Sequence, residues 1–297
     1  MGNKILYFIF LSFAKLIILF PNKARWYFFL SISRIAYYTS KRVRKRIQAN
    51  LDFVFADKMS KKEKKDISKF SFFNMALWAK TIFDCRLLNI KNIDKFVETQ
   101  NLSAFEKHIK EKRKIIFISG HFGNIEMLGC YMSLKIAKIV HIYRKSNFSL
   151  FDDYIVASRE SLGATMVEKT GALKKLARAL KHDMPVSMIM DQSVRPEVGI
   201  LVDFLGKKTY QTSSVAFLAQ KFDAVIVPLA FFTEGVNKYK VKFYEPILPF
   251  SFEDKRENLR LSAQAQADAI SKMVYEDPKQ WFWPHKRFKT LNKEIYE

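Results

Sequence analysis

His121 and Glu126 are two side chains whose types and spacing could perform acid–base chemistry. Imidazole exchanges a proton near neutral pH. A carboxylate that accepts a hydrogen bond from one ring nitrogen leaves the other nitrogen free to take a proton from a hydroxyl. On one continuous helix, residues five apart lie roughly 140° apart around the axis and do not meet. The pair can therefore converge only if the chain turns between them.

The residues around the histidine predict such a turn. Ile115 to Ile118 is a short apolar run rich in β-branched residues, typical of a buried strand, and it ends just before Gly120. Asn124 is a suitable N-cap, so a helix is expected to begin after it. We therefore place His121 on a strand-to-helix turn as a general base, with Glu126 as its hydrogen-bond acceptor. The alternative is a surface histidine and glutamate without a catalytic role.

Strands and helices alternate with short connections between about residues 114 and 232, which favours an α/β fold with a mixed, mainly parallel sheet flanked by helices. Further strands are predicted at 136–143, 163–167, 186–190, 224–232 and, as an edge strand, 239–244. Helices are predicted at 149–162, 171–182, 214–222 and 254–276. Functional groups gather beyond the carboxyl ends of parallel strands, so His121, Arg144 and Asp191-Gln192 are expected at one edge of the sheet.

The composition indicates an anionic partner. The 297 residues include 51 Lys+Arg and 29 Asp+Glu, a net charge of +22, which suits a membrane surface, a nucleic acid or an acidic protein. Aromatic residues make up 15% of the chain and favour a membrane over nucleic acid. The two cysteines, Cys85 and Cys130, imply neither a disulfide framework nor a zinc site and fit a reducing compartment. The sequence has no HExxH-type ligand pair, which disfavours a metal hydrolase.

The first 46 residues predict attachment to a membrane. Ile5 to Phe20 is almost continuously apolar, but a helix of this length reaches only about 24 Å, short of the ~30 Å hydrocarbon core. It could span with help from flanking lysines or lie within one leaflet. A second apolar stretch, Trp26 to Tyr38, precedes the basic run Lys41–Arg46. We expect residues 1–46 to be the anchor and residues 47–297 the catalytic domain; a buried pair of core helices is the alternative.

Several motifs together resemble the lipid A late acyltransferases, the lauroyl and myristoyl transferases of lipopolysaccharide assembly in Gram-negative bacteria. Gly120–Glu126 resembles their motif of a histidine, four residues and an acid. The later blocks are similar at Ile142-Tyr143-Arg144 with Arg159 and Gly163, at Met190-Asp191-Gln192 with Val202–Gly206 and Thr212, and at Trp281–Lys289. The resemblance covers residues from about 110 to 290. Lys145 stands where the family usually has a proline, which affects fine substrate contacts rather than the chemistry.

The resemblance implies a glycerolipid-acyltransferase-like fold. It also implies transfer of a fatty acyl chain from acyl carrier protein to a hydroxyl of a Kdo-bearing lipid A precursor. The enzyme would act at the cytoplasmic face of the inner membrane, without a cofactor, metal or nucleic acid. His121 would be the general base and Glu126 its partner. The residues implied to bind or orient substrate are Arg144, Arg159, Asp191, Gln192 and Thr212. The two arginines could instead form structural ion pairs, and Thr212 or Ser213 could cap a helix.

Two other functions compete with this interpretation. A glycerolipid acyltransferase would use similar histidine and acid chemistry. That class usually has asparagine before the histidine and aspartate as the acid, where this chain has Gly120 and Glu126. A non-enzymatic basic protein that binds membranes or nucleic acid would explain the net charge. It would not explain the polar clusters at the predicted strand ends.

Overall fold

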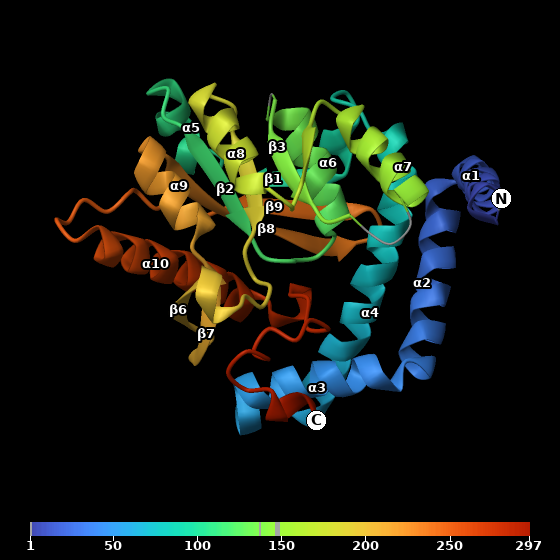
Figure 1. The fold of residues 1–297 in the computed structure, drawn as a ribbon. Helices are drawn as coiled ribbons and strands as arrows, with labels where there is room; N and C mark the ends of the chain where they lie inside the picture. Colours follow the sequence, from blue (N-terminus) through green and yellow to red (C-terminus); the bar gives the residue numbers. More distant parts are fainter. Residues whose placement is uncertain (1, 137, 146–148) are drawn as a thin grey trace.

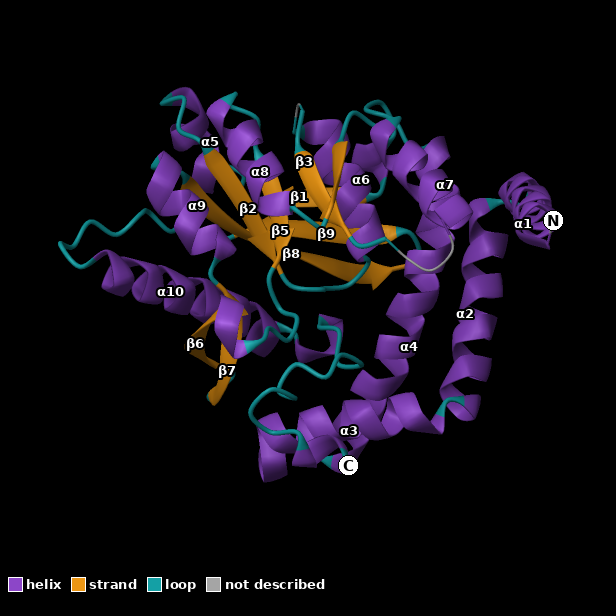
Figure 2. Cartoon of the chain, in the orientation of Figure 1, coloured by secondary structure: helices purple, strands orange, loops and turns teal. Residues whose placement is uncertain are grey.

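The computed structural model describes residues 2–136, 138–145 and 149–297. Its centre is a seven-stranded sheet in the order β1-β9-β8-β2-β5-β3-β4 (Figures 1 and 2). These strands are β1 Val97–Gln100, β2 Ile115–Ser119, β3 Val140–Tyr143, β4 Thr165–Glu168, β5 Val186–Ile189, β8 Val225–Gly235 and β9 Lys238–Phe243. Neighbouring strands are parallel except for the antiparallel pair β8 and β9. The α/β fold with a mixed, mainly parallel sheet is therefore confirmed.

Helices cover both faces of this sheet. They are α1 Gly2–Leu19, α2 Asn22–Thr39, α3 Lys41–Phe55, α4 Lys61–Asp84, α5 Ser103–Lys110, α6 Ile125–Lys135, α7 Ser149–Glu160, α8 Ala172–Lys181, α9 Ser214–Phe222 and α10 Lys255–Glu276. Side chains of β2 alternate between two cores, as strand geometry requires. Ile116 and Ile118 share a core with residues of α8, α9 and α10, whereas Phe117 shares one with residues of α5 and α6. The central strand is thus buried on both faces, which explains its continuous apolar sequence.

The strands differ from the sequence-based predictions in four respects. The predicted edge strand at 239–244 is β9, which lies between β1 and β8. The edge strand next to β9 is β1, which was not predicted because its short, polar sequence lacks the alternating apolar pattern of a strand. The predicted strand at 136–143 begins only at Val140, and residue 137 lies outside the described residues. An additional hairpin is formed by β6 Gly199–Phe204 and β7 Lys207–Thr212, where Leu205 and Gly206 turn with positive φ.

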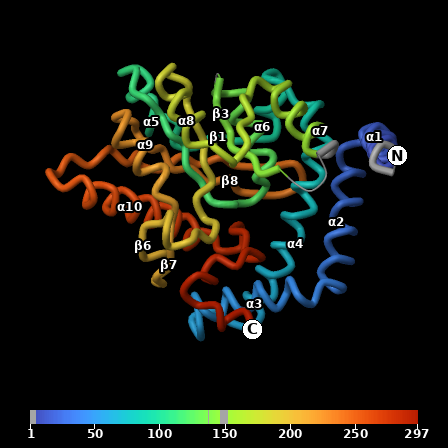
Figure 3. Tube along the Cα trace, in the orientation of Figure 1, coloured from blue at the N-terminus to red at the C-terminus, as the bar shows by residue number. Residues whose placement is uncertain are grey.

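The N-terminal helices form a separate layer that packs against α4 and α7. In Figure 3 the chain runs along α2 beside α4 and then through α3, which lies near the C-terminus. Many apolar side chains of α1 and α2 are exposed: Ile5, Leu6, Phe8, Ile9, Leu16 and Leu19 on α1, and Tyr27, Phe28, Ile32, Ile35 and Tyr38 on α2. Among the residues described here, no helix is both long enough and apolar enough to cross a membrane.

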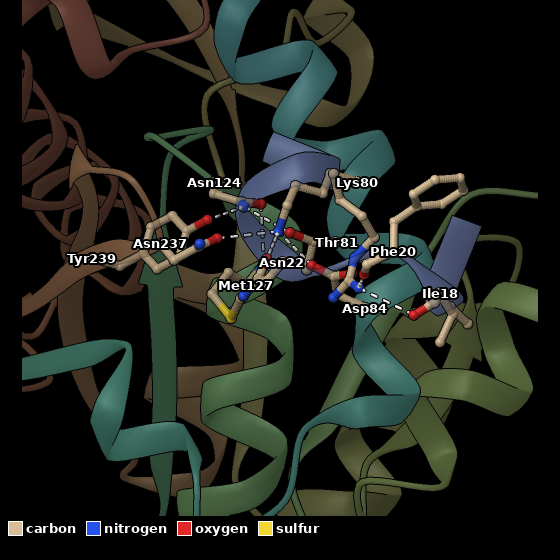
Figure 4. A network of polar contacts seen from close by, with 11 residues as sticks. Ile18, Phe20, Asn22, Lys80, Thr81, Asp84, Asn124, Met127, Asn237 and Tyr239 are labelled. Carbon is tan, nitrogen blue, oxygen red and sulfur yellow. Dashed lines mark hydrogen bonds and ion pairs between the residues drawn. The ribbon is translucent and has the colours of Figure 1, made fainter. Parts of the chain in front are cut away.

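A buried polar cluster joins α2 to α4 (Figure 4). Arg25 Nε donates to Asp84 Oδ1 at 2.8 Å, and Lys80 forms a second ion pair with the same carboxylate. Lys80 Nζ also donates to Asn22 Oδ1 at 2.7 Å and to Asn237 Oδ1 at 3.1 Å. Burial lowers the pKa of Lys80, and the charge and hydrogen bond of Asp84 oppose that shift. One carboxylate therefore compensates two buried cations.

We expect Asp84→Ala to lower the free energy of unfolding by about 3 kcal/mol or more, because Arg25 and Lys80 would remain buried without a carboxylate. The control is Asp66→Ala on the same helix, which removes an exposed carboxylate 3.8 Å from Lys69. This control should cost about 0.5 kcal/mol or less. Urea unfolding followed by circular dichroism measures both losses. Equal losses would contradict the stabilising role of the buried cluster.

Candidate active site

The predicted strand-to-helix turn is present, and His121 lies on it between β2 and α6. Asn124 caps α6, because its side-chain oxygen accepts a hydrogen bond from Met127 N at 3.2 Å. Gly123 has a φ of +46°, and a Cβ atom there would lie 2.5 Å from the backbone oxygen of Phe231. Only glycine fits that position without displacing the backbone.

Elements that are distant in the sequence form hydrogen bonds with this turn. Asn124 Nδ2 donates to Thr81 Oγ1 at 2.7 Å and to the Tyr239 hydroxyl at 3.3 Å, as Figure 4 shows. Trp78 Nε1 donates to the backbone oxygen of Gly123 at 2.7 Å. Helix α4 and strand β9 therefore fix the position of the turn, and the buried ion-pair cluster lies beside these contacts.

Asp191, just beyond the end of β5, is the hydrogen-bond partner of the His121 ring. Asp191 Oδ1 lies 2.7 Å from His121 Nδ1. The other carboxylate oxygen, Oδ2, accepts from the backbone N–H of His121 and from Trp281 Nε1, both at 2.7 Å. Nδ1 of the neutral ring donates to this carboxylate. Within the described part of the chain, Nε2 has no hydrogen-bond partner, so it can accept a proton.

The contacts between His121 and Asp191 affect the pKa values of both side chains more than their burial does. Burial alone would lower the pKa of His121, but the charge and hydrogen bond of Asp191, with a further contribution from Glu126, raise it above the usual value. Burial would raise the pKa of Asp191, but the charge and hydrogen bonds of His121 and the Trp281 indole lower it to about 2. Asp191 is thus ionised at neutral pH and stabilises the imidazolium.

Glu126 does not accept a hydrogen bond from His121, contrary to the sequence-based prediction. It forms an ion pair with Arg159 of α7. The prediction considered only residues close in sequence, whereas pairing of β5 with β2 brings Asp191 to the histidine from 70 residues away. Glu126 is near enough to affect the pKa of His121. Glu126 therefore belongs to the same site, but its ion-pair partner there is Arg159 and not His121.

A cavity of about 940 Å³ lies beside this pair and gathers nearly all the predicted site residues. Those that line it are His121, Glu126, Arg144, Arg159, Gln192 and Thr212, while Asp191 is bonded to the histidine. Much of the wall is apolar, from Ile125, Leu128, Met132, Ile155, Val156, Leu173 and Leu176. The volume is at the upper end of ordinary ligand pockets. In the described ranges, no group of three or more His, Cys, Asp or Glu is placed to hold a metal ion.

For Thr212, both of the roles that the sequence left open, substrate contact and helix capping, stay predictions; the N-cap position of α9 itself is occupied by Ser213. Thr212 lines the cavity, and its hydroxyl also contacts Ser214 at the start of α9. Arg159 likewise lines the cavity while paired with Glu126. Arg144 is exposed and has no ion-pair partner in the described part of the protein. A structural ion pair is thus present for Arg159, and the described residues show none for Arg144.

Aromatic side chains around His121 were not identified from the sequence. The Phe282 ring lies with its centroid 4.8 Å from that of Trp78 and 5.9 Å from that of His121. Trp281 is 1% exposed and reaches Asp191 through its indole N–H. The aromatic sequence at 281–283 was the available signal, but a sequence does not show which carboxylate an indole will meet.

The C-terminal segment also fixes the loop that follows β5. Arg287 is fully buried, and its Nη1 donates to the backbone oxygen of Gln192 at 2.6 Å. Burial lowers the pKa of Arg287 to about 10, and the charge of Asp191 opposes the shift. The backbone N–H of Ser193 donates to His285 Nε2 at 2.9 Å. Residues near the end of the chain therefore hold the loop that begins with Asp191.

Comparison with known proteins identifies the family. The model of the bacterial lipid A biosynthesis acyltransferase family matches residues 2–290. The chain belongs to this family. A lipid A biosynthesis lauroyltransferase from Escherichia coli (strain K12) is 22% identical over 261 residues, which cover 87% of this chain and 83% of the relative. The motif resemblance is therefore confirmed at the level of the family.

The comparison with solved structures found a similar chain in another protein. The crystal structure of the 1-acyl-sn-glycerophosphate acyltransferase PlsC from Thermotoga maritima matches with a TM-score of 0.40 and 15% sequence identity. The match covers 86% of this chain and 97% of the PlsC chain.

Trp281→Phe is expected to lower kcat of this acyltransferase about tenfold, because Asp191 loses one hydrogen bond to a charged group. The remaining carboxylate charge acts more strongly on His121, so its pKa rises and the acid side of the pH–rate profile moves to higher pH. Trp283→Phe is the matched control. Its indole is equally buried and donates to the backbone oxygen of Pro278 at 2.7 Å, without touching Asp191. Identical pH–rate profiles for the two variants would show that the Trp281 indole does not position Asp191.

Proposed function

We propose that this protein transfers a fatty acyl chain from acyl carrier protein to a hydroxyl of a Kdo-bearing lipid A precursor. One observation carries the proposal. His121 lines a large, mostly apolar cavity, and its Nε2 has no hydrogen-bond partner among the described residues, while its Nδ1 is bonded to the ionised Asp191. Membership of the lipid A biosynthesis acyltransferase family supports the nature of both substrates.

In the proposed reaction, His121 Nε2 removes the proton of the acceptor hydroxyl as its oxygen attacks the thioester carbonyl. A carbon–oxygen bond forms and the carbon–sulfur bond breaks. The leaving thiolate then takes the proton from the imidazolium. Asp191 keeps the ring in the correct tautomer and stabilises the imidazolium while it exists. A covalent intermediate on the protein is not required.

Glu126 and Arg159 are assigned a supporting role in the same reaction. The ion pair between them fixes the guanidinium of Arg159 on the cavity wall. A fixed cation there would stabilise the oxyanion that forms when the thioester is attacked. Glu126 thus acts through Arg159 and through its charge effect on His121.

Three basic side chains of the cavity suit an anionic lipid. Arg144, Lys169 and Arg195 line the cavity and are exposed, and guanidinium groups bind phosphates and carboxylates well. Gln192 and Thr212 add neutral hydrogen-bonding groups to the same wall. A lipid A precursor carries both phosphates and Kdo carboxylates, and its acyl chains match the apolar lining.

We further propose that α1 and α2 attach the protein to the cytoplasmic face of the inner membrane. Phe8 is 67% exposed and Leu19 is 80% exposed, which is unfavourable in water and favourable at a lipid interface. The basic run at Lys41–Arg46 follows directly and would contact anionic headgroups.

Mass spectrometry of lipid A tests the reaction. Cells that lack the gene should lose one secondary acyl chain, and the wild-type gene should restore it, whereas His121→Ala should not. The control is His108→Ala, since His108 also lies near a glutamate, 3.5 Å from Glu111, but does not line the cavity. This control should complement fully. Unchanged lipid A with altered phospholipids would support a glycerolipid acyltransferase instead.

The pH dependence of kcat/KM tests the assignment of the base. His121 must be neutral to take a proton, and its pKa is raised, so kcat/KM should fall toward acid with a midpoint above 6.5. Asp191→Asn removes the negative charge that raises the pKa of His121 but leaves the imidazole ring buried. The midpoint of the residual activity should therefore move to lower pH. That activity should be reduced at least ~100-fold, because the imidazolium loses its stabilising carboxylate. A wild-type midpoint below 6.5 would contradict this assignment.

A further inference from the structure

Helix α8 presents a row of positive charge on the surface. Four of its ten residues are basic, Lys174, Lys175, Arg178 and Lys181, and none is acidic. All four side chains are exposed. None of them forms an ion pair with another residue in the part of the chain that the structure describes. A helix face with four exposed basic side chains attracts an acidic partner.

The same helix forms part of the cavity wall. Leu173 and Leu176 line the cavity, together with Gly171 just before the helix. Leu176 and Leu180 are buried in the core, which turns the basic face outward. Leu173 is 42% exposed, so it belongs to both the cavity lining and the outer surface. Lys174 and Lys175 therefore directly follow the residue at which the cavity meets the surface, and Arg178 and Lys181 lie about one and two turns further along the helix.

We infer that the basic face of α8 is the docking surface for an acidic acyl carrier protein, which delivers its thioester-bound chain into the cavity past Leu173. The inference rests on the proposed function, because that function supplies the carrier-bound donor. A carrier protein with an acidic surface complements four exposed cations and would be steered to the cavity by their field. Lys169, which precedes the helix and lines the cavity, continues the charged surface.

Three observations favour a protein over a membrane at this surface. Leu173 is the one large exposed apolar side chain of α8, so the helix lacks a face that would insert into lipid. Helix α1, which carries exposed apolar residues, lies at a different side of the molecule from α8 (Figure 1). The other basic run, Lys41–Arg46 on α3, does not line the cavity and lies at the opposite end of the molecule (Figure 3).

Steady-state kinetics of the full chain with acyl carrier protein and a Kdo-bearing lipid A precursor test the inference. The variant Lys174→Glu/Lys175→Glu/Arg178→Glu should raise KM for the carrier-bound donor at least about tenfold with little change in kcat. The salt dependence of kcat/KM should also become weaker. Lys174→Ala/Lys175→Ala/Arg178→Ala preserves the helix and should show a smaller change in the same direction.

Two controls separate docking from other effects. Lys61→Glu/Lys62→Glu/Lys65→Glu makes the same change in charge on exposed residues at the start of α4, and its KM should equal that of the wild type. The second control replaces the carrier-bound donor by an acyl-pantetheine thioester, which has the same reactive group without the acidic protein. The α8 variants should use this donor as well as the wild type does.

Each possible outcome has a distinct meaning. An inactive wild-type enzyme would contradict the proposed function itself. An active wild type with the same KM for the α8 and α4 variants would overturn the inference alone. Equal losses with the pantetheine donor would also overturn it, because docking would not be the step affected. Loss of binding to anionic vesicles without a change in KM would assign α8 to the membrane instead.

Discussion

The buried carboxylate of Asp191 is the constraint on which the site depends. At 3% exposure it has little access to water, so protein donors must compensate its charge. Three N–H groups do so, two from His121 and one from Trp281. These three donors reach Asp191 only because β2 lies beside β5 and the C-terminal segment with Trp281 packs next to both strand ends. Gly120 belongs to the same arrangement, because a Cβ atom there would lie 3.0 Å from Asp191 Oδ2.

The C-terminal segment, residues 281–290, is consequently part of the candidate active site, because Trp281, His285 and Arg287 contact Asp191 and the loop after it. Arg287 is buried and forms no ion pair with a carboxylate among the described residues, which is costly, yet it holds the backbone of the loop that begins with Asp191. Asn50 on α3 fixes this segment from the other side, with hydrogen bonds to the backbone oxygens of Trp283 and His285 at 2.7 and 2.8 Å. Helices near one end of the chain thus support residues near the other end, and through them the histidine.

The sequence predicted local features well and distant contacts poorly. The strand before His121, the Asn124 cap and the group of site residues at strand ends all follow from short-range patterns, and the structure contains them. The partner of His121 could not be predicted, because several acidic residues were available and strand order decides which one arrives. The strand order also decides that β9 is internal. Strands β1 and β7 carry too few apolar residues for a periodic signal, whereas β6 is apolar at four of its six positions, Ile200, Leu201, Val202 and Phe204, and was missed.

Under the proposed function, the enzyme must bring together a lipid held in a membrane and a chain carried by a soluble protein. The cavity is bounded by α7, through Ile155, Val156 and Arg159, and by α8. Helix α7 is also the neighbour of α1, since the rings of Tyr154 and Phe10 pack 5.1 Å apart. The apolar, exposed layer therefore adjoins one wall of the cavity and the basic helix forms another. The two substrates can then approach His121 from separate sides, so neither has to leave before the other binds.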